Sequence, residues 1–279
     1  MRQLKITIAC LILPLLFCSS ALAYDRIISI IPSATKSIYL MGLEDKLVAV
    51  TVYCPPEASE KEKIGTVLEP DLEKIVSLEP DLVIATKEGN RHQTVEKLQS
   101  LGIKVYVMDS VNNFEEICGA FIKLGRFLGA DNSAGKVVRG ARKRIEKVRS
   151  VKRNSKPAVF CEIGARPLFT ASGGSFINDI IEFAGAANIF KDLKPRYPQI
   201  SREEVLKRDP DAIVIITMGD VTDKEKEAWN EFPGLKAARS GRIYVLSEAV
   251  FTDPTPSGLA DGVEILAQTL FGKSRDRKQ

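Results

Sequence analysis

The residue types that metal and nucleophile chemistry need are scarce in this chain. Its 279 residues contain one histidine, His92, which excludes a cage of several histidines and any mechanism that uses two of them. No Cys-x-x-Cys and no glycine-rich nucleotide-binding pattern occurs. We expect His92 to face solvent in the first turn of a helix; contact with a ligand or with iron is the alternative.

Three segments have compositions suited to a ligand cleft. Pro32-Ser33-Ala34-Thr35 follows an apolar run and would place hydroxyls and free N–H groups at a helix N-terminus. The run from Phe169 to Ser175 contains paired glycines that allow a ligand close to the backbone, and the run from Val250 to Pro256 is stiffened by prolines. Because ordinary turns also use glycine and proline, the pattern alone leaves both interpretations open.

Glu73 and Glu203 lie at matching places in an internal duplication. Residues 71–76 (DLEKIV) and 80–84 (PDLVI) repeat as 201–206 (SREEVL) and 210–214 (PDAIV), both at an offset of 130. Each copy is typical of an N-cap, a short helix, a Pro-Asp turn and a buried strand, and Ser201 with Glu204 predicts a capping box. A carboxylate at the second helical residue is explained by the helix dipole. The alternative is that the two glutamates contact arginines of a two-fold symmetric partner.

The elements around these residues alternate between strand-like and helix-like patterns. Short apolar runs typical of buried parallel strands occupy residues 26–31, 47–50, 82–85 and 103–107, and then 158–162, 212–216 and 242–245. The sequence therefore predicts an α/β fold with two Rossmann-like lobes, each built on a mainly parallel sheet.

One long helix is expected between the lobes. Residues 114–129 predict a helix, and residues 132–153 predict a second one with an apolar stripe on a basic surface. The stripe consists of Ala134, Val138, Ala141, Ile145 and Val148. We interpret the basic face as solvated, without a nucleic-acid partner. A stiff helical connection makes a large hinge closure unexpected.

The first 23 residues have the pattern of a cleaved secretory signal. Arg2 and Lys5 precede an apolar run that is too short to span a membrane, and Ala21-Leu22-Ala23 is a cleavage site. Phe17 before Cys18 does not fit a lipobox, so a soluble periplasmic form is expected. Cleavage leaves 256 residues (279 − 23) with a charge of about +2 (38 − 36), and this charge indicates no partner. We expect Cys54, Cys118 and Cys161 to remain unpaired. The expected division is 24–131, 132–153 and 154–279 for the N-terminal lobe, the linking helix and the C-terminal lobe.

Several segments together carry a resemblance to a known family. They include Arg26-Ile27-Ile28-Ser29, residues 78–85 (LEPDLVIA), Asn188-Ile189-Phe190-Lys191-Asp192 and residues 198–203 (PQISRE). Over nearly all of its mature length the chain resembles the periplasmic cobalamin- and ferric-chelate-binding proteins of ABC importers, and it is most similar to the cobalamin binders. The resemblance implies a monomeric, non-enzymatic carrier without a cofactor.

The same resemblance implies roles for particular residues. Glu73 and Glu203 would dock on the membrane permease, which works with its ATPase subunits. The ligand would lie between the lobes near Ser33, Ala34, Tyr53, Val67, Lys87, Gly89, Phe169, Thr170, Ser172, Gly173, Tyr197, Val250, Phe251, Thr252, Asp253 and Pro254.

The chain departs from the cobalamin binders at positions that bear on the ligand. Val67 and Tyr197 stand where those proteins often have tryptophans, Asp253 replaces an arginine, and Ala184 and Thr269 replace two cysteines. A corrinoid such as cobalamin is the favoured ligand, with haem or a ferric siderophore as the alternative. The rivals in function are a cluster-binding oxidoreductase subunit and a surface receptor that works without a transporter.

Overall fold

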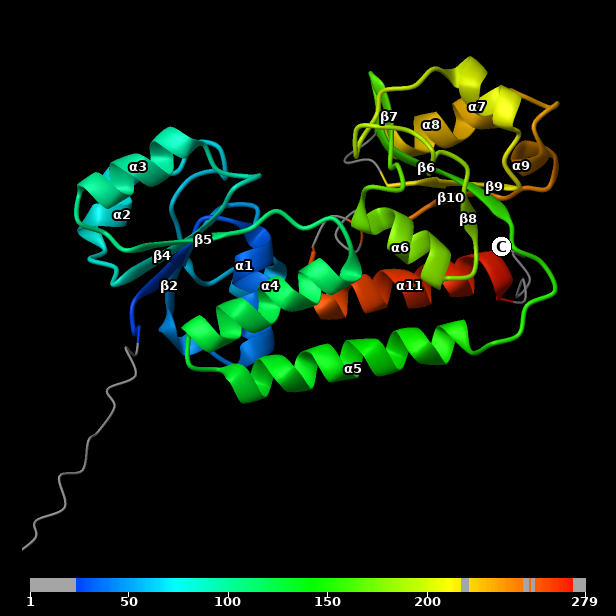
Figure 1. Cartoon of the computed structure of the whole chain (residues 1–279). Coiled ribbons are helices and arrows are strands. Elements are labelled where there is room, and N and C mark those ends of the chain that lie inside the picture. The colour runs from blue at the N-terminus through cyan, green and yellow to red at the C-terminus, as the bar shows by residue number, and fades with distance from the viewer. Residues whose placement is uncertain (1–23, 217–220, 248–250, 252–253, 273–279) are drawn as a thin grey trace, which may run out of the picture.

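Two five-stranded sheets form the frame of the molecule (Figure 1). The computed structural model describes residues 24–216, 221–247, 251 and 254–272; the expected signal segment lies outside these residues. The first sheet has the order β3-β2-β1-β4-β5 and is parallel throughout. Its strands are β1 (Ile27–Ser29), β2 (Leu47–Val50), β3 (Glu62–Lys63), β4 (Leu82–Thr86) and β5 (Val105–Met108).

The second sheet repeats this plan with one antiparallel strand. Its order is β10-β9-β6-β7, and β8 also pairs with β6. Only β7 among these described strands runs antiparallel to its neighbour. The strands are β6 (Ala158–Ala165), β7 (Leu168–Thr170), β8 (Ala187–Asn188), β9 (Ala212–Ile215) and β10 (Ile243–Val245). The predicted α/β class with mainly parallel sheets is confirmed.

Helices cover both faces of each sheet. The first lobe contributes α1 (Pro32–Met41), α2 (Leu72–Ser77) and α3 (His92–Ser100), with the short 3-10 helices η1 (Glu44–Lys46) and η2 (Pro56–Ala58). The second contributes α6 (Phe176–Phe183), α7 (Arg202–Arg208), α8 (Val221–Asn230) and α9 (Lys236–Arg239). Between the lobes lie α4 (Phe114–Phe127), α5 (Asp131–Arg149) and α11 (Pro256–Phe271). None of the helices in the described ranges is long and apolar enough to cross a membrane.

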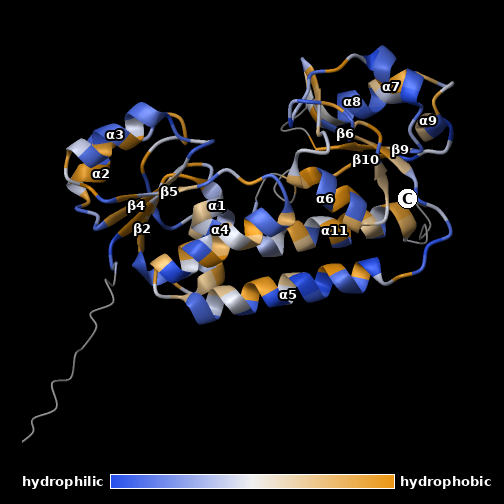
Figure 2. Cartoon of the chain, in the orientation of Figure 1, coloured by the Kyte–Doolittle hydropathy of each residue, from blue (hydrophilic) through white to orange (hydrophobic). Residues whose placement is uncertain are grey.

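The helix α5 connects the two lobes, as predicted, but it ends at Arg149 rather than near residue 153 and does not act alone. The C-terminal helix α11 returns along it and packs against α5, α6 and α4. Figure 2 shows α11 as mainly hydrophobic, whereas hydrophilic and hydrophobic residues alternate along α5. Of the predicted apolar stripe, Val148 is partly buried and the other four members are buried.

One hydrophobic core runs through both lobes. It includes Ile27 and Leu82 from the first sheet, Val138 and Ile145 from α5, and Val214 from the second sheet. Smaller cores cover the outer faces of the two sheets separately. Because apolar packing is continuous across α5, the lobes are held at a nearly fixed distance.

The duplication is reproduced in the backbone itself. Asp71 and Ser201 cap α2 and α7 by accepting hydrogen bonds from the N–H groups three residues on. Glu79 and Asp209, also 130 residues apart, adopt the left-handed conformation with φ of 45° and 43°. The second half of the predicted capping box is wrong, because the Glu204 carboxylate instead accepts a hydrogen bond from Arg208 Nε at 2.9 Å.

Candidate ligand cleft

The predicted N-terminal contacts lie at one edge of the first sheet. Ser33, Tyr53, Val67 and Gly89 follow β1, β2, β3 and β4, and these strands are parallel, so their carboxyl ends meet. The strand order reverses at β1. In open α/β sheets, the usual ligand site is the crevice at the carboxyl ends of the strands where the order reverses. A Cβ on Gly89 would lie 2.6 Å from Ile31 Cδ1 and 3.3 Å from Val67 Cγ1. The loops after β1, β3 and β4 are therefore in contact.

Asn90 holds these loops together. Its amide group donates to Ile30 O at 3.1 Å and to Val67 O at 2.9 Å, and its Oδ1 accepts from Thr86 N at 2.9 Å. The side chain is buried, and breaking any of these bonds leaves a buried polar group unpaired. Sequence reasoning missed Asn90 as an organising residue, because an asparagine after a glycine looks like an ordinary turn.

The rim of this lobe exposes apolar side chains. Val52, Tyr53 and Leu68 are 50%, 65% and 58% exposed, and Val52 N donates to Gly65 O, which joins their two loops. A flat apolar ligand would bury these side chains. Lys87 does not lie free here: it contacts Asp109 at 2.6 Å, and Lys123 shares the same carboxylate. These two lysines lower the pKa of Asp109 to about 2.

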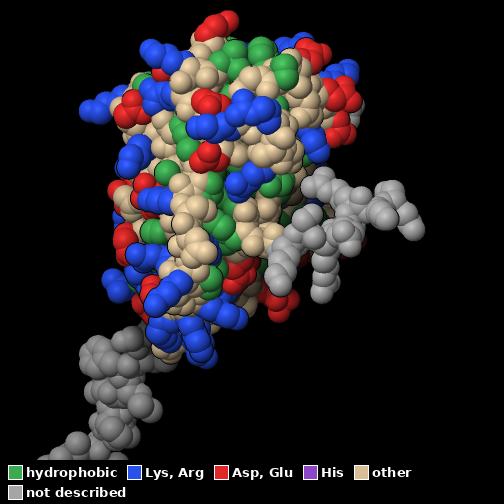
Figure 3. Space-filling view, turned by 90° about the vertical axis from the view of Figure 1, so that its right-hand side faces the viewer, with side chains coloured by type: hydrophobic (Ala, Val, Ile, Leu, Met, Phe, Trp, Pro, Cys, Tyr) green, Lys and Arg blue, Asp and Glu red, His purple; other side chains and the backbone are tan. Residues whose placement is uncertain are grey.

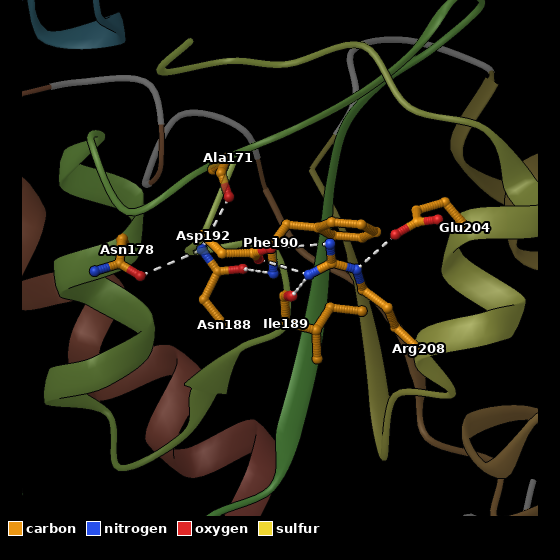
Figure 4. Close-up of polar contacts among 8 residues, drawn as sticks. All are labelled: Ala171, Asn178, Asn188, Ile189, Phe190, Asp192, Glu204 and Arg208. Atoms are coloured by element: carbon orange, nitrogen blue, oxygen red, sulfur yellow. Dashed lines mark hydrogen bonds and ion pairs between the residues drawn. The ribbon is translucent and has the colours of Figure 1, made fainter. Parts of the chain in front are cut away.

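The second lobe contributes the run from Phe169 to Gly174, and hydrogen bonds from Asn188 hold this run in place. Figure 4 shows Asn188 donating to Ala171 O at 2.9 Å and to Asn178 Oδ1 at 3.2 Å, while its own Oδ1 accepts from Phe190 N. Arg208 of α7 contacts Asp192 and Glu204 and stacks over Phe190 in the same view. The glycine at 173 has a structural reason that the sequence did not reveal, since a Cβ there would lie 2.5 Å from Lys191 O.

The side chains predicted in the second lobe differ in exposure. Thr170 is buried and its hydroxyl donates to Cys161 O at 2.7 Å, and Ser172 is buried with its hydroxyl accepting from Gly174 N. Phe169 and Tyr197 are partly exposed, and burial raises the pKa of the Tyr197 phenol, so this ring stays neutral. Phe251 belongs to the main core and Pro254 is half-buried. Val250, Thr252 and Asp253 lie outside the described residues.

Contacts across the lobes bring the two halves of the site together. Arg196, next to Tyr197, pairs with Glu88, next to Gly89, and donates from Nη1 to Val111 O at 3.0 Å. At the start of α4, Phe114 N also donates to Asp179 Oδ2 of α6 at 2.7 Å. Ser172 N donates to Arg196 O, which places the glycine loop beside this crossing. Predicted contacts from both lobes therefore adjoin one ion pair.

The three cysteines are unpaired as predicted, but only Cys118 and Cys161 are buried as small apolar residues. Cys54, Cys118 and Cys161 are free thiols, and burial raises the pKa of Cys118 to about 11 and of Cys161 to about 12. His92 is exposed at the first residue of α3. Cys54 is half-buried, with its Sγ 3.0 Å from Thr35 Oγ1 in the first turn of α1. No local pattern around Cys54 predicts its contacts with Thr35 and Thr51.

Glu73 and Glu203 are exposed on α2 and α7, one helix in each lobe, and both helices lie on the side away from α5 (Figure 1). The pKa of Glu203 lies below its usual value, because the carboxylate accepts a hydrogen bond from its own backbone N–H and from Ser201.

Comparison with known proteins decides the family. A family model described as periplasmic binding protein matches residues 27–250. The chain belongs to the periplasmic binding protein family. A vitamin B12-binding protein of Vibrio parahaemolyticus is 31% identical over 263 residues, which cover 92% of this chain and 94% of that protein. Another, from Pectobacterium atrosepticum, is 33% identical over 77% of this chain and 79% of its own length.

Solved structures of periplasmic binding proteins agree with this assignment. The periplasmic vitamin B12 binding protein of Vibrio cholerae is 30% identical with a TM-score of 0.72, and it covers 88% of this chain and 96% of its own. The periplasmic haem binding protein of Vibrio cholerae has a TM-score of 0.79 at 19% identity, over 88% of this chain and 98% of its own. Periplasmic binding proteins of this kind are the solute-binding components of ABC importers, and the chain is one of them; the family consists of carriers rather than enzymes.

Proposed function

We propose that the protein captures a corrinoid, cobalamin or a close relative, between its lobes and delivers it to the permease without catalysing a reaction. The observation that carries this choice is that relatives above 30% identity over most of the chain are vitamin B12-binding proteins. The exposed Val52, Tyr53 and Leu68 offer a flat apolar rim, and the partly exposed Tyr197 offers a ring for stacking from the other lobe.

Capture needs little motion in this frame. The core continues through α5, and Arg144 contacts both Asp261 and Glu264 of α11, so the lobes are preorganised. Affinity then comes from a site that is already formed, because little entropy is lost on closure.

Haem or a ferric siderophore is the second candidate ligand. The fold accommodates it, since the haem binding protein of Vibrio cholerae superposes with a TM-score of 0.79. At 19% identity that likeness concerns the fold, so the corrinoid stays the first choice.

A titration of the mature protein separates these ligands. Cyanocobalamin, haemin and a panel of ferric siderophores are added while heat is measured by calorimetry. The fluorescence of Trp229, the single tryptophan, provides a second signal. Because Trp229 is buried in the second lobe, its quenching reports energy transfer to a coloured ligand rather than contact with it. Submicromolar binding of cyanocobalamin alone supports the proposal, and binding of an iron chelate alone contradicts it. A visible spectrum before the titration tests for the bound cluster that an oxidoreductase subunit would carry.

A further inference from the structure

Arg196 belongs to the second lobe, and its guanidinium group reaches residues of the first lobe. Its Nη2 contacts Glu88 Oε1 and its Nη1 donates to Val111 O at 3.0 Å, while its guanidinium lies 5.4 Å from the centre of the Tyr197 ring. Glu88 stands between two residues that we propose as ligand contacts, Lys87 and Gly89. A ligand that fills this cleft therefore meets the ion pair.

The strength of the ion pair between Arg196 and Glu88 decides whether a ligand can replace one of its partners. The side chains of Arg196 and Glu88 are 27% and 41% exposed. Ion pairs this open to solvent contribute little to stability. Such a pair is too weak to set the distance between lobes that share a continuous core, but its partners are easily exchanged. An arginine binds a carboxylate or phosphate oxygen through two parallel hydrogen bonds, so an acidic group on a ligand can take the place of Glu88.

Other charges lie near the pair. Lys87 and Lys123 both contact Asp109, and the charge of Arg196 also acts on the Glu116 carboxylate. With Arg196 and Glu88 the group has three cations and three anions, a net charge of 3 − 3 = 0. Selection of an acidic group therefore depends on the two parallel donors of the guanidinium rather than on an excess of positive charge.

We propose that Arg196 is a specificity-determining residue that binds an acidic oxygen substituent of the metal chelate, a phosphodiester or a carboxylate, and that Glu88 holds the guanidinium in place until the ligand arrives. The inference rests on the proposed function, because it assumes that a chelate occupies this cleft. It adds the chemical group that the site selects and the residue that selects it.

Two matched pairs of chelates test the proposal and separate its two sources of acidic oxygen. Cyanocobalamin carries a phosphodiester that dicyanocobinamide lacks, and haemin carries two carboxylates that its dimethyl ester lacks. Dissociation constants are measured by calorimetry for the wild type and for the Arg196→Gln, Arg196→Lys and Glu88→Gln variants. We expect the wild type to bind the acidic member of the corrinoid or haem pair about tenfold more tightly than the member that lacks the acidic group. The ratio of these two dissociation constants measures the preference.

The variants move this preference in opposite directions. Arg196→Gln brings the ratio to within about twofold of one, Arg196→Lys keeps part of it, and Glu88→Gln raises it at least threefold because the internal competitor is gone. Glu115→Gln, which removes an exposed ion pair with Arg142 between α4 and α5, leaves the ratio unchanged.

The possible failures are distinct. A wild type that binds a chelate without preference for the acidic member overturns the role of Arg196 but keeps the proposed function. A preference that survives Arg196→Gln does the same. A wild type that binds no member of either pair overturns both.

Discussion

Two carboxylates are fully buried in the second lobe, close to the helix that carries Glu203. Glu162 Oε2 accepts a hydrogen bond from Trp229 Nε1 at 2.6 Å, and Glu225 contacts Arg202 of α7. Glu162 Oε1 has no hydrogen-bond partner, and Glu225 Oε1 has none either but lies 3.6 Å from Arg166 Nη2 in an ion pair. Burial and the charge of Glu225 raise the pKa of Glu162 to about 7, although the bond from Trp229 opposes this shift. Glu162 therefore holds a proton in the folded protein well above pH 4.5.

This raised pKa predicts how stability depends on pH. Between pH 4.5 and about 7 the folded state keeps a proton that the unfolded chain has lost, so the free energy of unfolding falls as pH rises through this window and then levels off. With 1.36 kcal/mol for each unit of pKa, the loss is on the order of 3 kcal/mol at most. Glu162→Gln keeps an acceptor for Trp229 and removes the charge. We expect it to be more stable than the wild type at pH 8 and similar at pH 4.5, as measured by urea unfolding. A parallel dependence on pH in both proteins would contradict a proton on Glu162.

Helices and strands were predictable where their pattern is local. The duplicated unit is an example, because the N-cap, Pro-Asp turn and apolar strand lie within 14 residues, and both copies fold alike down to the left-handed Glu79 and Asp209. The pairing of α11 with α5 was not predictable, since it depends on contacts between residues more than 100 positions apart, such as Arg144 with Asp261. The anchoring roles of Asn90 and Asn188 were missed because their side chains bond to backbone groups of other loops, such as Ile30 O and Ala171 O, which no local pattern reveals.

Two glycines of α4 show how packing between elements overrides helix propensity. A Cβ on Gly125 would lie 2.5 Å from Ala134 Cβ, where α4 meets α5, whereas a Cβ on Gly119 would have nothing within 4 Å. Replacing an open helical glycine by alanine stabilises a helix by about 1 kcal/mol. Overpacking between rigid helices costs about 1 to 3 kcal/mol. At Gly125 the cost exceeds the gain, because neither backbone can move away easily.

We therefore expect opposite effects from the same substitution in one helix. Gly119→Ala raises the free energy of unfolding by about 0.5 to 1 kcal/mol, and Gly125→Ala lowers it by about 1 to 2 kcal/mol. Both are measured by urea unfolding at one pH. If Gly125→Ala stabilised the protein as much as Gly119→Ala, the close packing of α4 on α5 would be wrong.

At the scale of the whole molecule, the continuous core through α4, α5 and α11 turns two lobes into one frame with fixed ends. Two basic side chains of α5 pair with acidic neighbours in this frame: Arg142 with Glu115, and Arg144 with Asp261 and Glu264. On the face turned to the viewer in Figure 3, Lys and Arg side chains are interspersed with Asp and Glu. Such a mixed surface gives no long-range attraction to a polyanion.

A rigid frame makes the spacing of Glu73 and Glu203 a fixed property of the protein. Each carboxylate is exposed at the second residue of a short helix, and the helices belong to the two copies of the duplicated unit. A permease with two-fold related arginines would engage both at once, so that the second contact forms at a high effective concentration. Either glutamate alone then gives weaker docking, and losing both removes most of the specific attraction.

This reasoning predicts how uptake responds when the two carboxylates are neutralised. Glu73→Gln or Glu203→Gln alone lowers uptake of labelled cyanocobalamin by cells several-fold, and the double variant lowers it at least tenfold. The dissociation constant of cyanocobalamin for the purified protein stays within twofold of the wild type, because neither residue is among the proposed ligand contacts. Glu115→Gln with Glu146→Gln, an exposed acidic pair on α4 and α5, serves as the matched control and leaves uptake unchanged. Full uptake by the double variant at Glu73 and Glu203 would favour a receptor that works without this docking, and leave the helix dipole as the reason for both carboxylates.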